Sequence, residues 1–375
     1  MSISSEFKRF PAHWDVLPFN EAVKDITSKS SKIPKTDYLK VGNIPVVDQG
    51  KLLFGGYTND ISLQARVEIP SIIFGDHTRI FKFIDRHFCL GADGAKILEP
   101  NVNLDKKFLF QYLKQLRIES AGYSRHYKFL KETLVPVPPL KEQKRIATIL
   151  DKADSIRRKR QYAIQLADKL LRAIFLDLFG DPVTNPKEWK VVEVGSVTDC
   201  IVPGRDKPKS FSGNIPWVTT NDLVHLGVTS KSIKSIGLSV DEIKQVKAKI
   251  VPKGSVVMTC VGDLGVVSLI GTDMVINQQL HAFLPSDEVN PSFLSYMLSF
   301  KKGYMVKMAS NTTVPYMNKS ICNSVPIFLP PANLQKRFSQ TVDHVKKIID
   351  KDIFSVKRSN ELFNSLSQQA FSGNL

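Results

Sequence analysis

The most informative segment of the chain runs from Val135 to Phe179 and reads VPVPPLKEQKRIATILDKADSIRRKRQYAIQLADKLLRAIFLDLF. From Leu140 onward it holds no Gly or Pro, and its apolar residues recur with the period of an amphipathic helix. The prolines before it suit a first helical turn, and Gly180 with Asp181 and Pro182 is a stop signal. A helix from Leu140 to about Leu178 would be roughly 60 Å long. Its predicted buried stripe is Ile146, Ile149, Leu150, Ala153, Ile156, Ala163, Leu166, Leu170 and Ile174.

The sequence at the start of this helix recurs 192 positions later. The segment PPLKEQKR at 138–145 returns as PPANLQKR at 330–337, and the segment from Trp14 to Ile26 is echoed from Trp189 to Ile201. The chain therefore repeats one unit, a globular domain followed by a long helix. The second helix is predicted from about Asn333 to Ala370. Its predicted stripe is Phe338, Val342, Val345, Ile349, Ile353, Val356, Phe363 and Leu366.

Two long helices with matched stripes can bury them on each other as an antiparallel coiled-coil pair. The alternative, in which each helix packs only on its own globular domain, is less favoured because the stripe is longer than such a domain can cover. We expect globular domains at 1–139 and 181–331 and helices at 140–180 and 332–375.

The globular domains are expected to be mixed α/β, because their short β-branched runs are bounded by Gly, Pro and Asp. Strands are predicted at 69–74, 80–84, 134–137, 255–260 and 266–270, helices at 104–116 and 291–308, and a linker at 181–187.

The charge balance favours a polyanionic partner. The chain has 52 Lys and Arg against 36 Asp and Glu, a net charge of +16, and the basic residues are densest from Arg157 to Arg160. That run is either a solvated helix face or a contact with phosphates or a partner. The N-terminus lacks a signal-peptide core and no apolar run is long enough to span a membrane, so we expect a soluble, cytoplasmic protein.

The cysteines indicate neither a zinc site nor a disulfide framework, because they lie far apart without a C-x-x-C pair. We expect Cys89, Cys200, Cys260 and Cys322 to be buried thiols in a reducing compartment.

Two variable domains, each followed by a long helix that opens with P-P-x-x-x-Q-K-R, resemble the specificity subunits of type I restriction-modification enzymes. FGDHTR (Phe74 to Arg79), GYSRHYKFLKE (Gly122 to Glu132) and NQQLHAF (Asn277 to Phe283) support the resemblance. The second helix departs from the pattern at Ala332 and Asn333, so its capping is expected to differ.

The resemblance implies two target recognition domains, each reading one half of a split, asymmetric sequence in double-stranded DNA, with the helices as spacer. Two methyltransferase subunits would dock on the helices, and two restriction/translocase subunits would join them. The chain itself would have no catalytic residues, metal or cofactor, since S-adenosylmethionine, ATP and Mg²⁺ would be bound by the partners. Half-sites read on the same face of the duplex lie one helical turn apart, about 34 Å. The two recognition domains therefore need a rigid separator of defined length.

Candidate DNA contacts are basic, aromatic and amide side chains on polar loops, because these groups bind phosphates and base edges. In the first domain they are Gln49, Tyr57, His77, Arg79, Tyr123, Arg125, His126 and Lys128. In the second they are Arg205, Lys207, Thr219, Asn221, Asp263, Asn311, Thr312 and Lys319. For each of these residues the alternative is an ordinary surface position.

Other classes are less favoured. A self-contained adenine methyltransferase needs a Gly-rich cofactor motif and an N-P-P-Y-like tetrapeptide, and the chain has neither. A nuclease needs clustered carboxylates, and the E-x-K fragments at 188–190 and 242–244 match only part of such a site, a triplet that arises easily by chance in a chain rich in Lys. His77 beside Asp76 lacks a nucleophile motif. A coiled-coil scaffold with protein-binding ends would show DNA affinity that depends little on salt.

Overall fold

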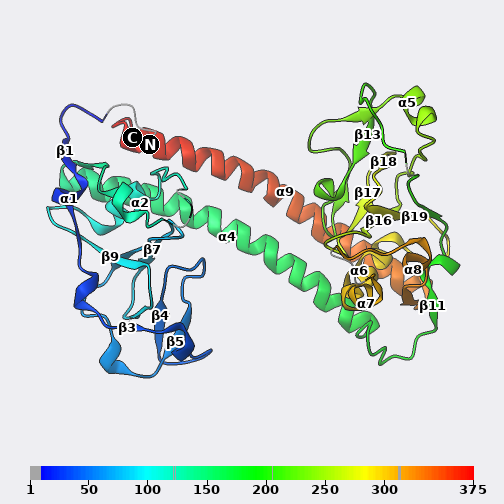
Figure 1. Cartoon of the computed structure of the whole chain (residues 1–375), viewed down its shortest axis with the longest axis horizontal. Coiled ribbons are helices and arrows are strands. Elements are labelled where there is room, and N and C mark those ends of the chain that lie inside the picture. Colours follow the sequence, from blue (N-terminus) through cyan, green and yellow to red (C-terminus); the bar gives the residue numbers. More distant parts are fainter. Residues whose placement is uncertain (1–9, 121, 123, 205, 311–313) are drawn as a thin grey trace. The chain divides into compact units, whose positions relative to one another are not determined.

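A computed structural model describes residues 10–120, 122, 124–204, 206–310 and 314–375, with the backbone alone at 350–357. The chain forms two compact units, one of Met1–Gln161 with Phe354–Leu375 and one of Tyr162–Ile353. Each unit contains one globular domain and one segment of each long helix (Figure 1).

The two long helices have the predicted bounds to within a residue. Helix α4 runs Leu140–Phe179 and helix α9 runs Ala332–Phe371. In the first unit, Ile146 near the start of α4 lies in one core with Phe363 and Phe371 near the end of α9. In the second unit, Phe179 at the end of α4 has its ring 5.6 Å from that of Phe338 near the start of α9. The start of one helix thus lies on the end of the other within each unit, which confirms an antiparallel pair.

The predicted stripe of α4 is wrong along the middle of the helix. Ile156, Leu166 and Leu170 are 43%, 45% and 51% exposed, and Ala163 is exposed too. The buried face near the end of the helix is instead Leu171, Phe175 and Phe179. The start of α4 packs in the core of the first unit and its end in the core of the second, so the buried face is set by a different neighbour at each end and not by one continuous stripe.

The stripe of α9 is confirmed where side chains are described. Phe338, Val342, Ile349 and Phe363 are buried. Val345 and Leu366 are half-buried, and the side chains of Ile353 and Val356 lie outside the described residues. The first turns of the two helices are capped alike, since Pro139 O accepts from the amides of 142 and 143 as Pro331 O does from those of 334 and 335. Asn333 adds one bond, from Leu334 N to its own Oδ1 (2.9 Å).

The first domain is built on an antiparallel sheet in the order β2-β9-β6-β7, with a second sheet in the order β3-β8-β4-β5. Their bounds are Val23–Asp25 (β2), Ala95–Pro100 (β9), Ser71–Gly75 (β6) and Phe81–Ile84 (β7), then Lys32–Ile33 (β3), Cys89–Gly91 (β8), Ile44–Val47 (β4) and Gly56–Thr58 (β5). Strands β1 (Asp15–Pro18) and β10 (Leu134–Val137) pair beside α4. The helices are α1 (Phe19–Ala22), α2 (Lys106–Leu113) and α3 (Tyr127–Leu130).

The second domain repeats this plan. The order β12-β19-β16-β17 corresponds to β2-β9-β6-β7, with β14 added at the edge, and β11 pairs with β20 as β1 does with β10. The bounds are Val191–Glu193 (β11), Cys200–Ile201 (β12), Ile215–Val218 (β13), Val228–Thr229 (β14), Gly237–Leu238 (β15), Val256–Thr259 (β16), Val267–Ile270 (β17), Val275–Ile276 (β18), Leu280–Phe283 (β19) and Pro326–Phe328 (β20). The helices are α5 (Val240–Gln245), α6 (Pro291–Phe300), α7 (Lys302–Met308) and α8 (Lys319–Asn323). The shared order confirms the internal repeat.

Two smaller expectations need correction. The helix predicted at 291–308 is two helices that part at Lys301, whose buried ammonium donates to the carbonyl oxygen of Pro182 (2.7 Å) and so fixes the break. Cys200 is half-buried because it lies on an edge strand, whereas the other three cysteines are buried, and all four are free. Within the described residues, no helix has the length and apolar character needed to cross a membrane.

Candidate nucleic-acid interface

The connection between β6 and β7, residues 76–80, is held by hydrogen bonds with other segments of the first domain. Asp76 is buried, and its carboxylate accepts a hydrogen bond from Tyr127 N (2.7 Å) while its carbonyl oxygen accepts one from His126 N (2.9 Å). Gln49 reaches the same loop from the β4–β5 hairpin, and its Oε1 accepts from His77 N (3.1 Å). Loops held this way keep a fixed shape, which a surface that reads DNA requires.

Arg79 lies at the end of this loop in a strained backbone conformation. Its φ is 62°, which non-glycine residues rarely adopt, and its guanidinium donates to the carbonyl oxygen of Ile118 (2.9 Å). The turn is tight, since a Cβ placed on Gly75 would lie 2.2 Å from the Oγ1 of Thr78. The surrounding structure therefore aims the Arg79 side chain, which is half-exposed.

The candidates of the first domain fall into three groups. Gln49, His77, Arg79 and His126 meet at the loop, but His126 is 1% exposed, so it supports the loop from inside. Arg125 and Lys128 are exposed beside it. Tyr57 lies on β5, and the described residues include no hydrogen bond or ring contact that joins it to this loop. Tyr123 lies outside the described residues.

The candidates of the second domain do not gather at one point. Thr219 caps a short helical turn, since its N and Oγ1 both donate to Asp222 Oδ2 (2.7 and 2.8 Å). Exposed Asp263 pairs with Lys302 (2.6 Å). Asn221, Lys207 and Lys319 are exposed. Arg205, Asn311 and Thr312 lie outside the described residues.

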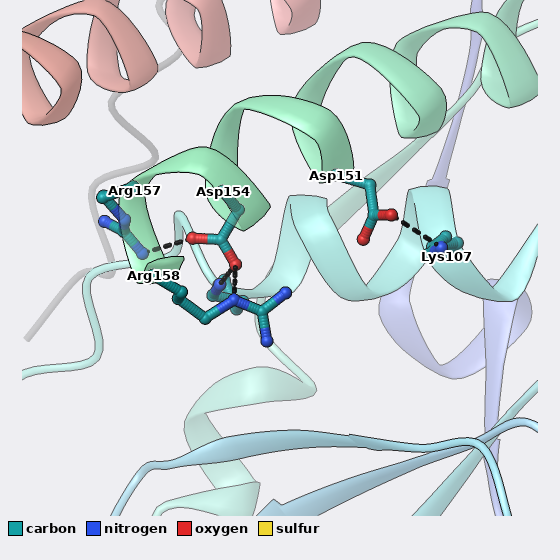
Figure 2. Close-up of polar contacts among 6 residues, drawn as sticks. Lys107, Asp151, Asp154, Arg157 and Arg158 are labelled. Carbon is teal, nitrogen blue, oxygen red and sulfur yellow. Dashed lines mark hydrogen bonds and ion pairs between the residues drawn. The ribbon is translucent and has the colours of Figure 1, made fainter. Parts of the chain in front are cut away.

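Part of the basic run on α4 has a structural role. Buried Asp154 forms ion pairs with Arg157, with Arg158 (3.3 Å) and with Lys114, the residue directly after α2 (3.5 Å). Figure 2 shows Asp154 between the two arginines, and Asp151 one turn earlier beside Lys107. Burial lowers the pKa of Lys114, although the neighbouring Asp154 opposes that shift. These contacts hold α2 on the long helix.

Comparison with known proteins identifies the family. The model of the type I restriction modification DNA specificity domain matches residues 19–166 and 186–359, that is, most of both repeats. The chain belongs to this family.

Relatives match either nearly the whole chain or about half of it. The EcoR124I/EcoR124II specificity subunit of Escherichia coli is 24% identical over 92% of this chain and 90% of that protein. The MjaIX specificity subunit of Methanocaldococcus jannaschii is 23% identical over 191 residues, half of this chain and 43% of that protein. The crystal structure of a type I S subunit from M. genitalium shares the fold, with a TM-score of 0.64 at 15% identity over 99% of both chains.

One group of residues in the second domain was not predicted from the sequence. The Gln278 amide donates to the carbonyl oxygens of Gly204 (3.1 Å) and Asp206 (3.2 Å), and so holds the loop that carries Lys207. Beside it lies a pocket lined by Lys207, Pro208, Phe211, Trp217, Asn277, Gln278 and Gln279. Amides read base edges and aromatic rings stack on bases. Three consecutive amides at 277–279 were the available signal.

Two titratable side chains of the second domain, one of them from an E-x-K fragment, have structural roles in this member of the specificity family. Glu242 of one E-x-K fragment accepts hydrogen bonds from Ser210, from Ser239 N and from Ser212, which lower its pKa to about 2. Burial lowers the pKa of His281 to about 4, and its Nε2 is 3.1 Å from Asn323 Oδ1. In the described part of the chain, no three His, Cys, Asp or Glu side chains are placed to hold a metal ion.

Proposed function

We propose that this specificity subunit reads a two-part, asymmetric sequence in double-stranded DNA, one half with each globular domain. The observation that carries the proposal is the repeat itself. The strand order β2-β9-β6-β7 recurs as β12-β19-β16-β17, while the β6–β7 and β16–β17 connections differ in sequence and length. One scaffold with two different loops fits two different half-sites. We assign the recognition domains to residues 1–139 and 181–331.

The long helices act as the spacer between the half-sites. Each has 40 residues and is therefore about 60 Å long. A helix of this length spans more than one turn of B-DNA, whose repeat is about 34 Å. The net charge of +16 supports a phosphate-binding role. The candidate residues around 76–80 and 125–128 would contact the first half-site, and those around the 277–279 pocket the second.

We further propose that two copies of the methyltransferase subunit dock on the helices, and that two restriction/translocase subunits complete the assembly. Support comes from exposed apolar residues that occur at equivalent positions of the two repeats. Ile156 and Ile348 are 43% and 53% exposed, and Leu170 and Leu362 are 51% and 57% exposed. Each pair is separated by the repeat offset, so each unit presents one isoleucine and one leucine. S-adenosylmethionine, ATP and Mg²⁺ would be bound by these cytoplasmic partners.

The test of DNA reading is a methylation map. The chain is expressed with its methyltransferase subunit in a host without other adenine methylation, and modified sites are located by single-molecule sequencing. We expect a motif of two unlike halves with a constant gap. A motif in one piece, or methylation unchanged when the chain is omitted, contradicts the proposal. The chain alone with DNA, S-adenosylmethionine and Mg²⁺ should give no methylation.

The test of docking uses Leu170→Asp and Leu362→Asp, singly and together. Native mass spectrometry of the assembly should show two methyltransferase subunits on the unaltered chain, one on each single variant and none on the double variant. Val183→Asp is the matched control, because Val183 is an exposed apolar residue of the linker. Two methyltransferase subunits on the double variant would refute this docking position.

A further inference from the structure

The glutamine of each P-P-x-x-x-Q segment is buried and hydrogen-bonded through both its amide oxygen and its amide nitrogen. Gln143 of α4 is 1% exposed. Its Oε1 accepts from Asp105 N (2.6 Å), and its Nε2 donates to the carbonyl oxygens of Pro138 (2.7 Å) and Asn103 (3.0 Å). One amide thus joins the first turn of the long helix to the segment that leads into α2.

The second copy repeats the arrangement. Gln335 of α9 is 3% exposed, its Oε1 accepts from Asn290 N (2.8 Å), and its Nε2 donates to the carbonyl oxygen of Pro330 (2.9 Å). The two domains differ in sequence, yet the same side chain makes the same pair of bonds in both. A buried amide is stable only when its donors and acceptor are paired, so this geometry is strongly specified.

The residues that the glutamines hold are helix caps. Asp105 caps α2 through bonds from Lys107 N (3.0 Å) and Phe108 N (2.9 Å) to its Oδ1. Asn290 caps α6 through bonds from Ser292 N (2.9 Å) and Phe293 N (3.2 Å) to its Oδ1. Each glutamine therefore fixes the start of one domain helix against the start of one long helix.

The domain helix that each glutamine fixes packs on the sheet that carries the proposed DNA-reading loop. Phe110 of α2 has its ring 5.2 Å from that of Phe83 on β7, and β7 begins where the 76–80 loop ends. In the second domain, Phe293 of α6 lies in one core with Met258 of β16 and Val267 of β17. A shift at the cap would move the helix and the sheet that carries the loop.

We propose that Gln143 and Gln335 are positioning residues that set how each recognition domain sits on its long helix, and so restrict the gap allowed between the two half-sites. The inference rests on the proposed function. One extra base pair moves a half-site by about 3.4 Å and turns it by about 34°, so a small change in seating alters which gap fits.

The test measures gap preference. The chain with its methyltransferase subunit is titrated with duplexes that carry the mapped half-sites at the native gap and at gaps one and two base pairs shorter or longer. The unaltered assembly should prefer the native gap by at least about tenfold. Gln143→Met and Gln335→Met, which keep the side-chain length but remove every hydrogen bond, should each reduce that preference to about threefold. The sequence preferred within each half should not change.

Matched controls are Gln161→Met on α4 and Gln340→Met on α9, because both glutamines are exposed on the same helices. They should keep the tenfold preference. Since the two buried glutamines lie in different units, either variant tests the proposal if the other does not fold.

Three results would overturn the inference. They are an unchanged gap preference in folded variants, an equal loss of affinity at every gap, and loss of folding in both single variants, which would make the glutamines general supports of the fold. Failure of the proposed function is distinct, because the unaltered assembly would then show no two-part motif.

Discussion

We expect Phe371, at the end of α9, to stabilise the first globular domain, although it is more than 200 residues away from that domain in the sequence. It is fully buried, and its ring lies 5.7 Å from that of Phe108 and 5.3 Å from that of Tyr112, both on α2. Replacing it with alanine removes the ring from a closed core and leaves a cavity beside both partners.

The expected loss is about 3 kcal/mol in the free energy of unfolding of the first unit. Phe→Ala substitutions in cores cost about 3–5 kcal/mol. We take the lower end because the chain ends only four residues later, at Leu375, and the last turn can relax into the cavity.

Hydrogen exchange of the full chain, read by mass spectrometry, measures this loss unit by unit. In Phe371→Ala, amides of α2 that exchange through opening of the whole unit should lose protection by about 150-fold, which is 3 kcal/mol at 25 °C. Amides of α6 in the second unit should keep theirs. Phe179→Ala is the matched control, because Phe179 is the same position of the first repeat and contacts Phe293 (4.9 Å) in the second unit.

Phe179→Ala should therefore produce the opposite pattern, with loss in α6 and none in α2. The reasoning is refuted if Phe371→Ala leaves α2 protection unchanged, or if it lowers protection equally in both units.

Three further predictions follow from the charges. Because burial lowers the folded-state pKa of His281 to about 4, the unfolded chain binds a proton that the fold does not. The free energy of unfolding of the second unit should therefore fall by up to about 3 kcal/mol between pH 6.5 and pH 4. In His281→Asn, the urea concentration at the midpoint of unfolding should depend less on pH in that range. Asp154→Asn should destabilise the first unit by about 1–3 kcal/mol by leaving three cations together, and added salt should reduce the loss in a thermal melt. Lys128→Ala should lower the slope of log K against log salt by about one, whereas a phosphate-independent role would leave the slope unchanged.

Loop composition was enough to predict that some of the candidate residues lie exposed on loops. Arg79, Arg125 and Lys128 were singled out because basic groups interleave with aromatic ones there, and the structure places all three at or beside the 76–80 loop with their side chains at least half-exposed. The sequence did not predict that His126 is buried or that Thr219 caps a short helical turn. The burial of His126 depends on a partner distant in sequence, Asp76, 50 residues away. The partner of Thr219 is local, since Asp222 lies three residues later.

The two-fold repeat, the bounds of both long helices and the main strands could be predicted from the amino-acid sequence, because helical period, strand composition and helix caps act over a few neighbouring residues. Three features are visible only in the folded chain: which face of α4 is buried, the break of 291–308 at Lys301, and the packing of the last turn of α9 in the core of the first domain. These features come from contacts between segments far apart in the chain, and local pattern does not encode which distant side chain fills a given space.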